Sequence, residues 1–414
     1  MSAPTKGLLP VFLTVFIDLL GFGIVIPLLP IYAQDHGASQ LSLGLLFASF
    51  SLMQLIFAPL WGRLSDRIGR KPVLVGGLIG TAGSYVLFGM ADTMTMLFVS
   101  RALAGFFGAN VATAQAWVAD VTAPEDRAQG MGIIGAAFGL GFTFGPLIGG
   151  EMVGLGTGAP GFAAAGLSAV AAIVGMIRLH EPPRHRDDSS RAYGLRTISN
   201  GLRQPVIGTV LLLYFLGILA FSGFESMFIR FGLERFPETF GLTGAISDAT
   251  HAQILAAAPI AGRYMFVIGL IAAVIQGGFI RRLVPRFGET RLIVAGPLFL
   301  GLSFALLAIA PNWALVIGAC ALMPFGFGLN NPALQGLLSR AVPADHQGAF
   351  LGLNQSLGSL ARVVGPVIAG LLFQIGDAGT PFVAGAGILF AATLVAVVYH
   401  VKFASHFTRR GESA

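Results

Sequence analysis

The sequence has little charge and almost no cysteine. Asp, Glu, Lys and Arg together make up 11% of its 414 residues, whereas 55% of the residues are hydrophobic. Because a soluble domain carries about 25% charged residues, this composition excludes a soluble protein and predicts a polytopic protein of the lipid bilayer. The one cysteine, Cys320, excludes a disulfide framework and a cysteine-based metal site.

Motifs for ATP-driven or enzymatic chemistry are also missing. The sequence has no G-x-x-x-x-G-K-[ST] loop to hold phosphates, no H-E-x-x-H metal motif, and seven dispersed histidines. We therefore expect no enzyme activity, no metal and no cofactor. Transport by such a chain would draw on a proton gradient or on a separate ATPase subunit.

Twelve apolar windows of about 20 residues, the length that spans a bilayer, follow one another along the chain. They cover approximately residues 8–31, 42–62, 73–91, 95–119, 130–153, 160–179, 206–231, 256–280, 291–310, 312–338, 347–374 and 380–402. The loops on one side of these windows hold 20 of the 25 Lys and Arg residues. Because positive loops stay in the cytoplasm, both termini are predicted to be cytoplasmic, and the compact ends fit a bacterial inner membrane. The net charge of +6 then reflects topology and not nucleic-acid binding.

A polar segment and an internal repeat divide the chain into two halves. RLSDRIGRKPV at 63–73 is similar to RLVPRFGETRL at 282–292, and GPLIGG at 145–150 is similar to GPVIAG at 365–370. We therefore predict an all-α membrane fold, with twelve helices in two pseudo-symmetric lobes and a substrate site near the midplane between the repeats. The predicted lobes are residues 1–180 and 206–414, the cytoplasmic linker is 181–205, and a monomer is expected. Outside the membrane, residues 234–251 are predicted to form an exposed loop with a short surface helix.

The most distinctive stretch is GRLSDRIGRKPV, residues 62–73, between the second and third spans. Apolar sequence on both sides predicts a tight cytoplasmic turn, in which Gly62 and Gly69 let the backbone reverse. The stretch matches the signature loop of the major facilitator superfamily. The chain resembles that superfamily and, within it, the twelve-helix drug:proton antiporters that include the tetracycline efflux pumps. The resemblance implies a conformational charge network of Asp66, Arg67, Arg70, Lys71 and Asp120. In the second copy of the loop, Pro285 stands in place of the acid.

Two further motifs carry the resemblance. The fourth span contains RALAGFFGAN. Burying its Arg101 in a membrane costs free energy unless the side chain has a partner or snorkels to the surface. The resemblance implies a role for Arg101 in proton coupling. The fifth span is rich in glycine, which favours close helix packing. Its GPxxGG ending resembles the antiporter motif of exporters, formed here by Gly141, Gly145, Pro146, Gly149 and Gly150.

Two acidic residues lie inside predicted spans and away from the span ends. Asp18 lies in the middle of the first span and Glu225 in the outer half of the seventh, which are corresponding helices of the two lobes. A bare carboxylate in a membrane is costly, and such a group suits proton exchange. We predict that one of the two takes the coupling proton, with Glu225 slightly favoured. The alternative for each is a structural hydrogen bond or ion pair, for which Arg263 and Arg362 are plausible partners.

Polar residues in the other spans indicate a cavity that is partly polar, although any one of them is more typical of an interhelical hydrogen bond. The candidates are Gln54, Asn110, Gln115, Asn331, Gln335, Asn354, Arg263 and Arg362. The 34 Phe residues allow an aromatic lining for lipophilic substrates. Tetracycline pumps of this branch carry an acid in the third span, where this chain has Ser84, so tetracycline itself is not the expected substrate.

These observations predict a secondary active transporter. The favoured function is a proton-coupled antiporter that exports lipophilic small molecules or drugs by alternating access, as multidrug efflux proteins in antibiotic resistance do. The alternative is export of a single metabolite, sugar or glycolipid by the same fold. The partners are then the small substrate, protons and the bilayer.

Overall fold

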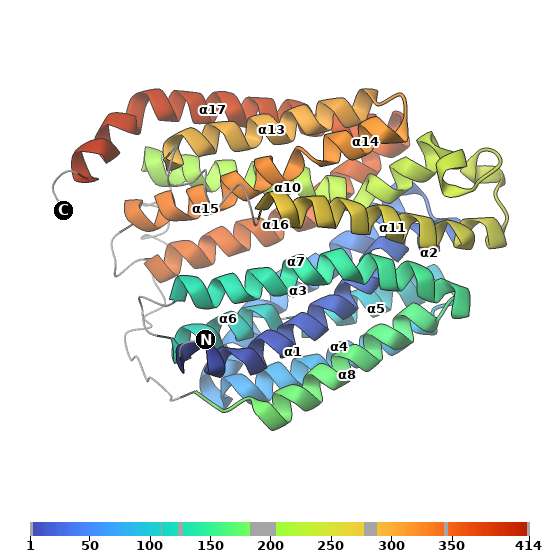
Figure 1. The fold of residues 1–414 in the computed structure, drawn as a ribbon, viewed down its shortest axis with the longest axis horizontal. Coiled ribbons are helices and arrows are strands. Elements are labelled where there is room, and N and C mark those ends of the chain that lie inside the picture. The colour runs from blue at the N-terminus through green and yellow to red at the C-terminus, as the bar shows by residue number, and fades with distance from the viewer. Residues whose placement is uncertain are drawn as a thin grey trace. The chain divides into compact units, whose positions relative to one another are not determined.

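A computed structural model of the protein describes residues 3–108, 110–122, 127–182, 204–276, 288–342 and 347–411 (Figure 1). Within these ranges every regular element is a helix, as expected for a chain whose backbone polar groups must be satisfied inside lipid. In the described part of the chain, twelve helical segments are long and apolar enough to cross a membrane, which confirms the twelve predicted spans. The protein is an integral, multi-pass membrane protein.

The described helices fall into two compact units. The first unit comprises residues 1–186 and 228–270, and the second comprises residues 187–227 and 271–414. These units are defined by contacts between helices, whereas the predicted lobes 1–180 and 206–414 are defined by a sequence repeat. The lobe boundaries therefore remain a prediction. Most of the linker and the second copy of the signature loop, including Pro285, lie outside the described residues.

The first unit contains the helices of the first six spans and part of the next two. In chain order its elements are α1 (Ala3–Val25), η1 (Ile26–Leu28), α2 (Leu29–Asp35), α3 (Gln40–Ile68), α4 (Arg70–Gly89), α5 (Met94–Phe107), α6 (Asn110–Val121), α7 (Arg127–Met152), η3 (Val153–Leu155), α8 (Ala159–Arg178), the end of α10 (Pro205–Arg235), η4 (Pro237–Phe240), η5 (Ile246–Asp248) and most of α11 (His251–Ile275). The short helices η4 and η5 confirm the predicted helical structure in the outer segment 234–251.

Helix α1 lies at the centre of the packing in the first unit. It packs against both α7 and α8, and α8 packs in turn against α4 (Figure 1). Their apolar faces meet in a core that includes Val15, Leu78, Val118, Ile134 and Ala171, each no more than 3% exposed. Any polar side chain that α1 directs into this core is therefore surrounded by helices on several sides.

Two interruptions of the helices shape the candidate site. The first span is broken at η1, where Pro27 and Pro30 lack the amide hydrogens that a continuous helix needs. The fourth span is broken after α5, where the carbonyl of Gly108 accepts a hydrogen bond from Gln54 Nε2 at 2.8 Å. Helix α6 then begins at Asn110, so the second break places this amide inside the core.

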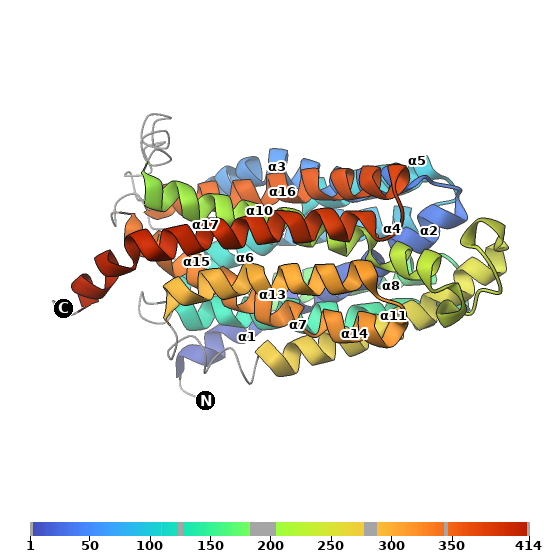
Figure 2. The same ribbon diagram turned by 90° about the horizontal axis from the view of Figure 1, so that it is seen from above.

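The second unit has the same all-helical character. After the first part of α10 it contains α13 (Glu289–Ile309), α14 (Trp313–Cys320), α15 (Met323–Ala341), α16 (Gln347–Ile375) and α17 (Thr380–Gly411). Helix α13 packs against α15 and α17, and the pairing of α13 with α17 is visible in both ribbon views (Figures 1 and 2). Its core includes Tyr214, Ile293, Leu334 and Ala392.

Candidate functional site

The signature loop is shorter than its sequence indicates. Helix α3 continues through Gly62 to Ile68, Gly69 alone forms the turn, and α4 begins at Arg70. Gly69 has a φ of +113°, in the region that favours glycine. The prediction that Gly62 also makes the turn is therefore wrong, because this glycine is helical.

Arg70 is the centre of the predicted charge network. Its Nη1 lies 2.5 Å from Asp66 Oδ1 and donates to Ser65 Oγ at 2.7 Å, while its Nε donates to Asp120 Oδ2 at 2.9 Å. The planar guanidinium group has several N–H donors and can therefore bond several acceptors at once. The network thus ties together the ends of α3, α4 and α6. Arg67 is exposed and forms none of these bonds.

A further acid, Glu181, completes this cluster. Its carboxylate accepts hydrogen bonds from the backbone amides of Arg70 and Lys71, at 2.6 and 3.0 Å, and so caps the N-terminus of α4. The negative charge also complements the positive end of the helix dipole. Lys71 takes part in the cluster through this amide. Sequence reasoning assigned Glu181 to the linker and missed it, although an acid directly after a membrane span was a usable signal.

Asp18 lies in the core of the first unit and is only 9% exposed. Its Oδ2 accepts a hydrogen bond from Asn110 Nδ2, and its Oδ1 accepts one from Ser168 Oγ, both at 3.2 Å. Asn110 Nδ2 also lies 3.5 Å from Thr81 Oγ1. In the described part of the chain no Lys or Arg forms an ion pair with Asp18. A carboxyl group held by neutral donors can gain or lose a proton without breaking an ion pair.

Arg101 is also buried in the first unit, with 1% of its surface exposed. Its guanidinium lies over the ring of Phe50 at 4.6 Å and over that of Phe22 at 5.7 Å. Tyr85, also buried, is near enough to feel the charges of both Asp18 and Arg101. A snorkelling arginine would expose its guanidinium to solvent, so this burial does not fit the snorkelling alternative.

The predicted antiporter motif is a packing surface on α7. A Cβ atom added to Gly141, Gly145 or Gly149 would meet the backbone of α1, at distances of 2.9, 2.5 and 2.5 Å. A Cβ added to Gly150 would lie 2.5 Å from the carbonyl of Ala258 in α11. The backbone of α7 therefore packs directly against the backbones of α1 and α11, as small residues allow in membranes.

The remaining predicted residues are more scattered. Glu225 is partly buried and belongs to the second unit, so the shared cavity with Asp18 stays a prediction. Arg263 pairs with Glu151 at 2.7 Å and not with Asp18. The other candidates differ in burial: Asn354 is buried, Gln115 and Asn331 are partly buried, and Gln335 and Arg362 are exposed.

Comparison with known proteins places these features in a family. The chain matches the Major Facilitator Superfamily over residues 11–277 and 239–412. It is 32% identical over 366 residues to the class C tetracycline resistance protein of Escherichia coli, covering 87% of this chain and 88% of that one. It is also 32% identical over 370 residues to multidrug resistance protein 1 of Bacillus subtilis (strain 168), covering 89% of each. The crystal structure of the human organic anion transporter MFSD10 (TETRAN) matches with a TM-score of 0.71 and 26% identity, over 96% of this chain and 100% of that one. The chain therefore belongs to the Major Facilitator Superfamily.

Proposed function

We propose that the protein is a proton-coupled exporter of lipophilic small molecules or drugs that works by alternating access in a bacterial cell membrane. The observation that carries this proposal is Asp18, a carboxyl group that is buried among helices and accepts hydrogen bonds from the neutral donors Asn110 and Ser168. Its surroundings favour a change of protonation over a fixed ion pair. The names of two relatives, a tetracycline resistance protein and a multidrug resistance protein, support drugs as the class of cargo.

Loss of the proton would leave a negative charge on Asp18 in a site of low polarity. The charge then strengthens the hydrogen bonds from Asn110 and Ser168, which come from α6 and α8. The bonds would draw both helices toward α1. Protonation reverses these forces. A proton that enters down a membrane potential supplies about 2.3 kcal/mol per 100 mV, enough to bias an equilibrium between two conformations.

The cytoplasmic cluster around Arg70 would act at the other end of α6, which carries both Asn110 and Asp120. It joins α4 to α3 and α6, and Glu181 fixes the first turn of α4. In this proposal the cluster holds one conformation until the proton state of Asp18 changes. Both termini would lie on this cytoplasmic side, and the protein would act as a monomer.

The substrate is proposed to be lipophilic and variable in structure. Ser84, at the position of an acid in tetracycline pumps, donates to the carbonyl of Thr81 in its own helix at 2.7 Å and adds no charge. An uncharged side chain at this position fits apolar cargo better than cationic cargo. Export of a single metabolite, sugar or glycolipid is the competing function, and the breadth of accepted compounds distinguishes the two.

Transport in proteoliposomes with an imposed pH gradient tests the proposal. Several chemically unrelated lipophilic compounds are offered to the wild type, to Asp18→Asn and to Glu225→Gln. Asp92→Asn, a change of an exposed acid in the loop after α4, serves as the control. We expect the control to retain accumulation and at least one of the two intramembrane variants to lose it. Full gradient-driven accumulation by both would overturn the proton-carrier assignment, and transport of one compound alone would favour the competing function.

A further inference from the structure

Two polar pairs, one of them an ion pair, join α11 to helices of the first six spans. His251 Nδ1, at the start of α11, lies 2.5 Å from Asp35 Oδ1, at the end of α2. Arg263 Nε, farther along α11, donates to Glu151 Oε1 of α7 at 2.7 Å. The paired residues are 216 and 112 positions apart in the sequence. Both pairs lie toward the ends of α2 and α7 that the predicted topology places outside the membrane.

Asp35 occupies an unfavourable position unless it has this partner. It is the last residue of α2, where a helix repels negative charge, and its side chain is only 10% exposed. The neighbouring His36 is engaged with the carbonyl of Tyr32 at 2.8 Å, while the hydroxyl of Tyr32 donates to the carbonyl of Thr157. His251 from α11 therefore offers the polar contact that a buried carboxylate needs.

Below the two polar pairs, α7 and α11 form a tight seam. Added Cβ atoms would lie 2.5 Å from the carbonyl of Ala258 at Gly150, and 2.9 Å from Thr143 Oγ1 at Gly269. The rings of Phe144 and Phe266 are 5.5 Å apart along the same seam. Backbones packed this closely leave little room for water between the helices. The two polar pairs therefore lie at the outer edge of a tightly packed helix contact.

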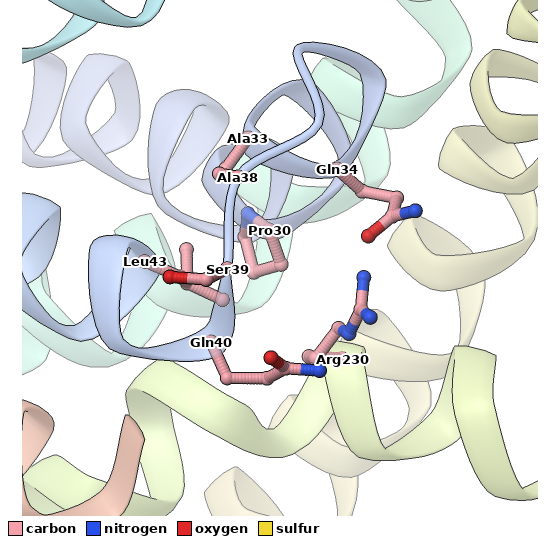
Figure 3. Close-up of a pocket in the computed structure, with 8 residues that line it drawn as sticks. All are labelled: Pro30, Ala33, Gln34, Ala38, Ser39, Gln40, Leu43 and Arg230. Atoms are coloured by element: carbon pink, nitrogen blue, oxygen red, sulfur yellow. The ribbon is translucent and has the colours of Figure 1, made fainter. Parts of the chain in front are cut away.

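A second element of the later spans meets the same end of α2. Arg230 of α10 lines a small pocket with residues of α2 and of the turn before α3, and its guanidinium points toward the side formed by Gln34 (Figure 3). The Arg230 side chain is 10% exposed and pairs with Glu234 at 3.3 Å. The outer end of α2 is thus the place where α10 and α11 both dock.

We propose that Asp35–His251 and Glu151–Arg263 form an outer latch, whose opening separates α11 from α2 and α7 and exposes the transport path to the outer face. The four residues are then positioning residues of the transport cycle, acting through the seam beneath them. This inference rests on the proposed alternating-access function, because only such a cycle requires the seam to open.

Thiol labelling in intact cells tests the latch without any substrate or proton gradient. A reporter cysteine replaces Ala258, which is 0% exposed at the seam, in a background where the buried Cys320 is changed to Ser. A membrane-impermeant maleimide added outside then reports opening of the seam. We expect Glu151→Gln or His251→Ala to raise the labelling rate about fivefold or more, the lower end of typical coupling between sites. Glu238→Gln, a change of an exposed acid in the same outer segment, should leave the rate unchanged.

Reversing the charges of Glu151 and Arg263 tests whether their ion pair, and not the shape of the side chains alone, holds the helices together. Glu151 and Arg263 have side chains that are 47% and 63% exposed, so both positions tolerate the opposite charge. Glu151→Arg and Arg263→Glu should each raise labelling, and the double variant should return it to the wild-type rate. Equal labelling of the double and single variants would overturn the role of this pair. Unchanged labelling in every latch variant would overturn the latch as a whole.

Cross-linking provides a second, independent readout. Asp35→Cys together with His251→Cys, in the same Cys320→Ser background, is treated with a short bis-methanethiosulfonate reagent. We expect the cross-linked protein in proteoliposomes to stop transporting and to recover after reduction. Transport at the same rate before and after reduction would contradict the latch. Absence of transport in the untreated wild type would instead count against the proposed function, while the labelling result would still stand.

Discussion

Glu181→Ala should release the first turn of α4, and its effect can be worked out from the structure. The Glu181 carboxylate accepts hydrogen bonds from the amides of Arg70 and Lys71 at 2.6 and 3.0 Å. Alanine removes both acceptors and the negative charge at the positive end of the helix. The two amides then have no capping side chain, and water must take its place.

The expected magnitude follows from two contributions. Loss of a side-chain cap costs about 1 kcal/mol, and loss of a charge that complements the helix dipole costs about 0.3–1 kcal/mol at a partly exposed site. Together these amount to about 1–2 kcal/mol, which corresponds to a change of about 5- to 30-fold in the equilibrium between the closed and open turn.

Hydrogen–deuterium exchange measured by mass spectrometry is the suitable assay, because it reports local opening and not global unfolding. Exchange of the Arg70 and Lys71 amides should accelerate by the same factor in Glu181→Ala, whereas amides in the middle of α4 should be unaffected. Asp92→Ala, at the opposite end of α4, is the matched control. Unchanged exchange of the two amides in Glu181→Ala would refute the capping role.

Three further predictions concern other parts of the molecule. Gly145→Ala should abolish folding or transport because its methyl group would meet the α1 backbone, whereas Gly139→Ala, which points into open space, should be neutral in expression and transport assays; equal behaviour of the two variants would contradict this packing. Phe50→Leu should lower the stability by about 1–2 kcal/mol in thermal unfolding of the purified protein, because Arg101 loses a buried cation–π contact; an unchanged melting temperature would show that the contact is unimportant. Arg70→Lys should lower turnover as much as loss of either acid partner does, because an ammonium group cannot reproduce the guanidinium fork; wild-type turnover would argue against a divided bond.

Much of the fold could be predicted from the sequence because the bilayer leaves few choices. A chain in lipid must satisfy its backbone within helices, so apolar windows alone gave the twelve spans. The resemblance likewise indicated Asp66 and Arg70 of the signature loop together with Asp120 of the fourth span, and Arg70 does bond both acids. The motif identified these residues through resemblance, and the structure adds their geometry.

The contacts of Asp18 could not be predicted in the same way. Asn110 and Ser168 lie 92 and 150 residues away in the sequence, and nothing local indicates that α6 and α8 bring them to one carboxylate. Gly62 and Gly69 illustrate the same limit on a small scale. Both are glycines of one motif, and only the backbone conformation shows that the second makes the turn.

The pairs Asp35–His251 and Glu151–Arg263 could not be predicted from the sequence either. Arg263 was considered a partner for Asp18 or Glu225, but it pairs with Glu151. A single sequence gives the type of each residue and its span but not its depth or direction. Pairing between distant helices depends on both, which is why the partners of Arg263 and His251 required the structure.

The most direct test of the central claim compares two transport modes of Asp18→Asn in proteoliposomes. Counterflow exchanges labelled for unlabelled substrate without a net proton movement, whereas accumulation under a pH gradient requires coupling. If Asp18 carries the proton, Asp18→Asn should retain counterflow and lose gradient-driven accumulation. Asp18→Asn that keeps both modes at the wild-type rate would contradict the account.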